Sequence, residues 1–188
     1  MAHNLHRVAQ MVGLASWLVL AAASTAWAEA PKPLKHTTTA DHSKFKELDR
    51  KFDTGPEVTK ACLACHTEAA KQIHKTQHWK WEFTNPDTQQ VLGKKHVVNN
   101  FCTSVKSNEA ACNSCHIGYG WKDDTFDFTV EENVDCLACH DATGKYKKPS
   151  GFAGNPVTKD TEFPPGTGKN VRGINLREIA EKVGPTKL

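Results

Sequence analysis

The chain has 188 residues, of which 38% are apolar and 24% are charged, and its formal net charge is +3. This length allows one ordinary domain or two small ones. With so small a net charge, nothing in the composition indicates nucleic-acid binding, so we expect no nucleic acid among the partners.

The N-terminal segment, residues 1–28, predicts a cleaved secretory signal peptide. It holds one cation and no acid, an apolar run at 11–23, and a small-x-small sequence, Ala26-Trp27-Ala28, at its end. The apolar run is too short to span a bilayer, and no later stretch is long enough. We therefore expect a periplasmic chain, residues 29–188, that is not embedded in the membrane.

The predicted elements that follow are short and separated by loops. A helix is predicted from the start signals Thr54 and Pro56 through Lys75. Residues 125–130 alternate and predict one short strand, and residues 145–168 predict an extended loop rich in Pro, Gly, Lys and Thr. Residues 172–182 predict a short final helix. The fold class is therefore mostly α with much irregular structure.

Six of the seven cysteines form three Cys-x-x-Cys pairs, and a histidine directly follows each pair. This is the attachment sequence for c-type haem, in which both thiols join the porphyrin and the imidazole binds iron. We therefore expect three covalently attached haems, whose faces also supply the apolar core that so polar a chain lacks. The attachment residues are Cys62, Cys65, Cys112, Cys115, Cys136 and Cys139, and the proximal iron ligands are His66, His116 and His140.

Two other chemistries use paired cysteines. Cys112/Cys115 and Cys136/Cys139 are spaced as in a four-cysteine zinc ribbon, but zinc does not explain why a histidine follows all three pairs. An oxidising compartment favours disulfides. Cys-x-x-Cys disulfides, however, close short strained loops that are typical of redox sites. Haem attachment explains the whole pattern.

The second axial position of each iron needs a side chain or stays open for substrate. Both methionines, Met1 and Met11, lie in the leader, so methionine ligation within residues 29–188 is excluded. Because methionine ligation raises the potential, we expect low-potential haems. The candidate distal ligands are His78, His74, His42 and His96, with His36 as a weaker candidate. His74 and His78 share one face if their helix continues.

The seventh cysteine, Cys102, belongs to no pair. In an exported protein such a thiol is buried and inert, paired to another chain, or functional. It lies ten residues before the second motif, where it could sit over that haem. The second and third motifs are only 24 residues apart (Cys112 to Cys136), which predicts that their haems lie close together.

The segments 58–66, 77–81 and 132–148 resemble the N-terminal part of the octahaem tetrathionate reductases. These are periplasmic multihaem cytochromes c, related in design to hydroxylamine oxidoreductase and the multihaem nitrite reductases. The resemblance covers the chain from about Asp41 onward. It implies eight haems, mostly bis-His, and one active-site haem with a lysine ligand. It also implies reduction of tetrathionate to thiosulfate, and of nitrite and hydroxylamine to ammonium.

By the same resemblance, the active-site haem corresponds to the second motif, and Cys102 matches a cysteine near that site. Lys187 is a candidate for the lysine ligand by position only. The chain departs from the family because it has three motifs and ends at Leu188, where the family continues with five more. A final helix with nothing to pack against agrees with a portion of a larger octahaem domain.

Two functions are consistent with these observations. One is part of a multihaem reductase that acts on a small oxyanion or sulfur oxyanion, attracted by cations such as Lys94, Lys95 and Lys106. The other is a stand-alone trihaem electron-transfer cytochrome without a catalytic haem. In both, the expected partners are redox proteins, either other cytochromes or a quinol-oxidising membrane cytochrome.

Overall fold

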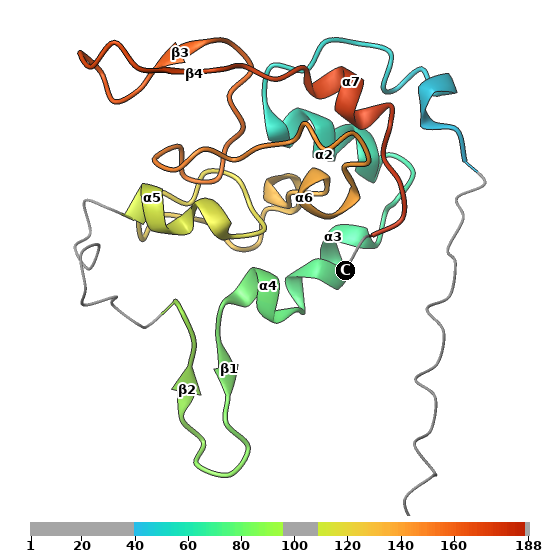
Figure 1. The fold of residues 1–188 in the computed structure, drawn as a ribbon. Helices are drawn as coiled ribbons and strands as arrows, with labels where there is room; N and C mark the ends of the chain where they lie inside the picture. Colours follow the sequence, from blue (N-terminus) through green and yellow to red (C-terminus); the bar gives the residue numbers. More distant parts are fainter. Residues whose placement is uncertain (1–39, 96–108, 187–188) are drawn as a thin grey trace, which may run out of the picture. The chain divides into compact units, whose positions relative to one another are not determined.

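The computed structural model describes residues 40–95 and 109–186, and short helices and irregular segments dominate it (Figure 1). The helical elements are η1 (His42–Lys44), α2 (Gly55–Leu63), α3 (Ala69–His74), α4 (Gln77–Lys80), α5 (Glu109–Cys112), η3 (Asn113–Cys115), η4 (Glu131–Asn133), α6 (Leu137–His140) and α7 (Leu176–Ala180). The predicted fold class, mostly α with much irregular structure, is confirmed. No helix in the described ranges is long and apolar enough to cross a bilayer.

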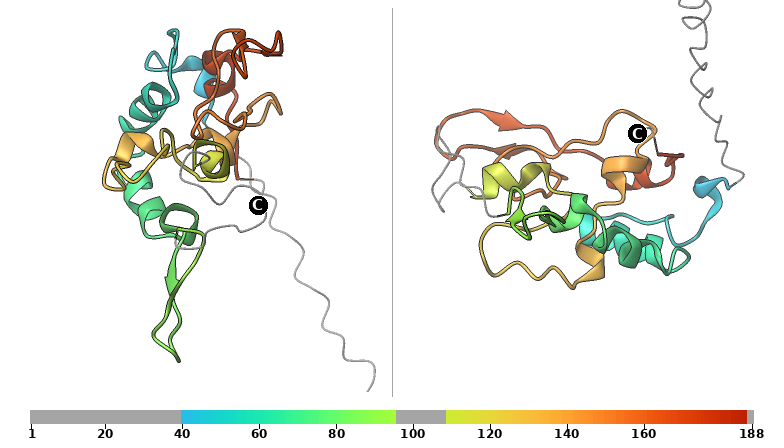
Figure 2. Two further views of the ribbon diagram at one scale, coloured as in Figure 1. Left: turned by 90° about the vertical axis from the view of Figure 1, so that its left-hand side faces the viewer. Right: turned by 90° about the horizontal axis from the view of Figure 1, so that it is seen from below.

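Within the described residues, the sheets are two small antiparallel hairpins. β1 (Phe83–Thr84) pairs with β2 (Val91–Leu92), and β3 (Thr161–Glu162) pairs with β4 (Asn170–Val171). The β1–β2 hairpin extends away from the helices (Figure 2). The β3–β4 hairpin lies in and just after the predicted loop 145–168, which is otherwise without helix or strand.

Helix α2 begins at its predicted start signals. The Thr54 side chain accepts a hydrogen bond from the Glu57 amide, and Pro56 occupies the first turn, where its missing N–H costs nothing. Val58 on this helix is fully buried. It belongs to a cluster with Leu48, Phe52, Leu137, Leu176, Ile179 and Ala180, so residues from both ends of the described chain share one core.

The final helix is shorter than predicted and better packed. α7 starts after Asn175, whose side chain caps the helix by accepting from the Glu178 amide. Leu176 and Ile179 are both 1% exposed, because their i, i+3 spacing puts them on one face against Val58 and Leu137. Figure 1 shows α2, α6 and α7 next to one another. The expectation that this helix has nothing to pack against is therefore wrong.

The helix that carries the first motif does not continue to Lys75 as predicted. It stops at Leu63, resumes as α3, and breaks again before α4 at Thr76, whose backbone is extended (ψ 160°). The Thr76 hydroxyl donates to the Ile73 carbonyl at 2.7 Å, a local bond that competes with the helical pattern. His74 and His78 therefore do not share one face of a continuous helix, contrary to the expectation.

The strand expected at 125–130 is also absent from the described structure. The carboxylates of Asp123 and Asp127 each accept from the amide and hydroxyl of the threonine two residues later, which bends the chain twice. Phe126 and Phe128 still point inward, as the alternation indicated, and pack against a cluster around Trp79. The alternating pattern therefore predicts the partial burial of Phe126 and Phe128. In the described structure, however, residues 125–130 pair with no neighbouring strand.

Candidate functional site

Each Cys-x-x-Cys-His motif lies on a short helical turn. The Cys62 carbonyl accepts from the amides of Cys65 and His66 at 3.1 and 2.9 Å, and the Cys136 carbonyl accepts from the His140 amide at 3.1 Å. At the second motif, α5 and η3 carry Cys112 and Cys115 in the same manner. A helical turn places residues i, i+3 and i+4 on one side, so the two thiols and the imidazole of each motif can reach one porphyrin.

At the first motif, the imidazole of His66 faces the imidazole of His42. The two ring centres are 6.4 Å apart, and the ring planes are within 18° of parallel. His42 is half-buried, and its Nδ1 is buried without a hydrogen-bond partner in the described structure. Burial, and then the nearby charge of His66, lowers the pKa of His42, which keeps this imidazole in the neutral form that binds metal.

The ring centres of these two imidazoles are about as far apart as those of two imidazoles that bind one metal ion. With metal–nitrogen bonds of about 2.0–2.1 Å, two imidazoles on opposite sides of one ion have ring centres about 6.3 Å apart. His42 and His66 match that separation at 6.4 Å. The first motif therefore fits a haem whose iron is held by histidine on both faces.

The third motif presents an oriented histidine. His140 is exposed, and its Nδ1–H donates to the Gly184 carbonyl at 2.9 Å. The Gly184 amide returns a bond to the His140 carbonyl, also at 2.9 Å. Because a carbonyl can only accept, Nδ1 carries the proton and Nε2 keeps the lone pair that a metal needs. This motif also fits an attached haem.

The second motif is enclosed by aromatic rings. His116 is fully buried, and five rings lie with their centres 4.8–5.9 Å from its own: Trp79, Trp81, Trp121, Phe126 and Phe128. Its Nε2 lies 2.6 Å from the Trp79 carbonyl, and its Nδ1 has no partner in the described structure. Burial lowers the pKa of His116 to about 4. A haem on this motif requires the ring to turn away from the Trp79 carbonyl.

The first and third motifs meet through their leading cysteines. The two thiols lie near enough to shift one another's pKa: Cys136 lowers the pKa of Cys62, and Cys62 raises that of Cys136. Thr59, one turn before Cys62, reaches the same place: its hydroxyl donates to the Val134 carbonyl at 2.5 Å and lies 3.8 Å from the Cys136 sulfur. The short sequence separation predicted only that the second and third motifs lie close together. It did not predict that the first motif meets the third.

The second and third motifs are joined by backbone and by charge. Gly118 and Val134 form an antiparallel bridge, and the Asp135 amide donates to the Ile117 carbonyl at 3.0 Å. The Asp135 carboxylate, fully buried, pairs with Lys148 at 3.0 Å. Sequence reasoning missed this pair, because the two residues are 13 positions apart in segments without regular periodicity.

The other candidate residues are dispersed. His74 stacks on Trp79 with ring centres 4.4 Å apart, and burial lowers its pKa. His78 is exposed on α4. The candidates that lie outside the described residues are His36, His96, Cys102, Lys106 and Lys187.

Within residues 40–95 and 109–186, no three or more His, Cys, Asp or Glu side chains are gathered to hold a metal ion by themselves. The four cysteines of the zinc alternative are therefore not brought together there. Cys62, Cys65, Cys115, Cys136 and Cys139 carry free thiols.

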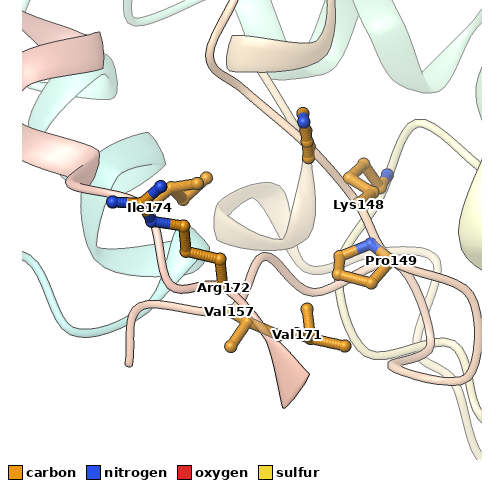
Figure 3. Close-up of a pocket in the computed structure, with 7 residues that line it drawn as sticks. Lys148, Pro149, Val157, Val171, Arg172 and Ile174 are labelled. Carbon is orange, nitrogen blue, oxygen red and sulfur yellow. The ribbon is translucent and has the colours of Figure 1, made fainter. Parts of the chain in front are cut away.

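Positive charge gathers at one pocket of about 470 Å³, shown in Figure 3. Lys147 and Arg172 supply the charge, because Lys148, which also lines the pocket, pairs with Asp135. The apolar wall consists of Pro149, Val157, Val171 and Ile174. Such a lining suits an anion with an apolar body. Elsewhere, Lys95 pairs with Glu82 at 3.3 Å and Lys94 lies over the Trp81 ring, so neither is an isolated cation.

No protein-family model matches the chain. The chain is similar to the crystal structure of octaheme cytochrome c from Shewanella oneidensis, with a TM-score of 0.64 and 44% identity, over 78% of this chain and 30% of that one. An uncharacterized protein of Archaeoglobus fulgidus is 26% identical over 183 residues, which is 76% of this chain and 59% of that protein. The chain thus spans less than two thirds of either relative. Its fold is that of a multihaem c-type cytochrome, to which its sequence is also related.

Proposed function

We propose that the chain is an exported, periplasmic c-type cytochrome segment that holds three covalent haems and carries electrons through them at low potential. The observation that carries the proposal is the placement of His42 opposite His66, at the separation of two imidazoles on one iron. The three Cys-x-x-Cys-His turns supply the attachment points. Bound haem iron takes up and releases single electrons, which is the chemistry of an electron carrier.

Cysteines would attach the three haems, and histidines would bind their iron. Each cysteine pair supplies two thioether links, and His66, His116 and His140 supply one imidazole each. His42 supplies the second imidazole at the first motif, which closes that iron to substrate. His74 and His78, together with His96, stay candidates for the remaining distal positions.

The contact between Cys62 and Cys136 supports a path for electrons between the first and third motifs. These two cysteines would each attach a haem, and because their thiols lie near one another, the two haems would be held close together. The bridge between Gly118 and Val134 ties the second motif to the third in the same way. The third motif would therefore be the junction of the three.

The specific activity we propose is that of the N-terminal, three-haem portion of an octahaem reductase of tetrathionate, nitrite or hydroxylamine. Support comes from the 44% identity to a segment that makes up 30% of an octaheme cytochrome c. The alternative is a trihaem carrier with every iron six-coordinate, and the His42–His66 pair at the first motif fits both functions. Redox proteins are the proposed partners in both cases, and Lys147 and Arg172 at the pocket would attract a small oxyanion.

The ligand assignment is tested by His42→Ala in the haem-loaded protein. We expect one of three haems to change from low-spin to high-spin in the ferric EPR and visible spectra, and added imidazole to restore the low-spin signal. Lys44→Ala is the matched control, because Lys44 belongs to the same turn and is 78% exposed. Unchanged spectra in His42→Ala would refute the assignment.

The choice between reductase and carrier is tested by turnover with a chemically reduced viologen. Consumption of tetrathionate, nitrite or hydroxylamine by the haem-loaded chain supports the reductase. Complete low-spin spectra without turnover support the carrier.

A further inference from the structure

The buried ion pair between Asp135 and Lys148 is not among the haem-attachment residues or candidate iron ligands named above. The Asp135 side chain is fully buried and the Lys148 side chain is 11% exposed, so both charges are removed from water. A charged pair in such surroundings is costly unless every donor and acceptor is satisfied. The contacts of both groups therefore need to be followed one by one.

The Asp135 carboxylate has four donors. Its Oδ1 accepts from the Tyr119 hydroxyl at 2.8 Å and from the Ala138 amide at 3.0 Å. Its Oδ2 accepts from the Tyr146 hydroxyl at 2.9 Å and from the Lys148 ammonium at 3.0 Å. An ionised carboxylate has about four acceptor sites, so this one is fully used.

The Lys148 ammonium is likewise satisfied, and its partners come from another motif. Besides Asp135, it donates to the backbone carbonyl of His116 and, at 3.3 Å, to that of Gly118. An ammonium has three donors, and three acceptors surround this one. Through this pair, the backbone of His116 in the second motif is connected to the third motif. Asp135 directly precedes Cys136, and it accepts from Ala138 in the first turn of α6.

The two charges act on both motifs. The Lys148 ammonium lies at the carbonyls of His116 and Gly118, and the Asp135 carboxylate accepts from the Ala138 amide, between the two cysteines of the third motif. In the intact pair the two opposite charges largely cancel, so their combined electrostatic effect on more distant groups is small. Removing one of them leaves the other buried and unpaired beside both haem sites.

We propose that Asp135 and Lys148 are positioning residues that lock the second and third haem motifs together and balance the charge between them, which sets the reduction potentials of the two haems. The proposal rests on the proposed haem function. An unpaired cation stabilises an added electron and an unpaired anion opposes it, so the two single variants must shift the potentials in opposite directions.

The test is a spectroelectrochemical titration of the haem-loaded chain and its variants. Asp135→Asn is expected to shift midpoint potentials upward, Lys148→Met downward, and the double variant to return them toward the original values. Lys148→Arg keeps the charge and is expected to hold the potentials near the original values, which covers the case that Asp135→Asn fails to fold. The control is Lys145→Met, which removes one cation from an exposed pair with Glu178 and is expected to shift little.

Any other pattern overturns the proposal: no shift beyond that of the control, shifts of the same sign, or a shift in one single variant only. A role in folding alone would change stability without opposite signs in the potentials. Covalent haem is measured first by the pyridine haemochrome spectrum. A starting protein without covalent haem overturns the proposed function as well, whereas a haem-loaded protein with the wrong pattern overturns only the role of this pair.

Discussion

Gly118 lies where two buried rings leave no room for a side chain. A Cβ atom there would be 2.8 Å from the His116 Nδ1 and 2.9 Å from Cζ3 of Trp79. Contacts that short force one ring to move, and overpacking of this kind costs about 1–3 kcal/mol. The contact with Trp79 does not depend on the orientation of the His116 ring. We therefore expect Gly118→Ala to lower the free energy of unfolding by about that amount, measured by denaturant titration of the haem-loaded chain.

Gly184→Ala is the matched control for this prediction. Its added Cβ would meet only the Ala142 Cβ, at an ordinary contact distance of 3.5 Å. We expect the free energy of unfolding to change by less than about 0.5 kcal/mol in this variant. Equal losses in the two variants would contradict the steric explanation.

At the same scale, the residues that attach haem were predictable and their partners were not. Cys62 and His66 are four positions apart in one helical turn, so local sequence places them. His42 lies 24 positions before His66, in a separate turn, and only the folded chain brings the two rings together. From the sequence, His42 is one of several candidate distal ligands, and nothing in the sequence distinguishes it from the others.

The helix α7 illustrates packing at the scale of an element. Leu176 is 1% exposed and contacts the cluster formed with Val58 and Leu137. Leu176→Ala leaves a cavity there, and such changes cost about 2–5 kcal/mol. We expect a matching fall in the free energy of unfolding, measured by denaturant titration.

Arg177→Ala serves as the control on the same helix. Arg177 is 46% exposed and pairs with Asp49 and Glu181 at the surface, and surface pairs contribute about 0–1 kcal/mol. A loss in Leu176→Ala no greater than that in Arg177→Ala would show that α7 is not part of this core.

Elements were predicted well where local signals decide them. Thr54 and Pro56 mark the start of α2 because capping and first-turn geometry depend on near neighbours. The break between α2 and α3 was missed. The turns at Asp123 and Asp127 were also missed, because side-chain bonds to nearby backbone outweigh the alternating pattern there. The apolar pattern of Phe126 and Phe128 predicted burial but not strand pairing.

At the scale of the whole molecule, composition indicated too little apolar mass for a core, yet the described chain forms two small apolar clusters. One contains Val58 and Leu176, and the other surrounds Trp79. Both adjoin haem motifs, since Cys62 packs against the first cluster and Cys136 against the second. The clusters therefore hold the motif turns in place, and haem would add apolar surface beside them.

The central claim is that each of the three motifs holds one covalent haem, and intact-mass spectrometry of the chain matured in a periplasm tests it most directly. The predicted result is the mass of the chain from Glu29 onward plus three haems, retained after acid–organic extraction. Replacing both cysteines of one motif, as in Cys62→Ala with Cys65→Ala, is predicted to remove one haem mass. A chain without added haem, with fewer than three, or with haem lost on extraction would contradict the claim.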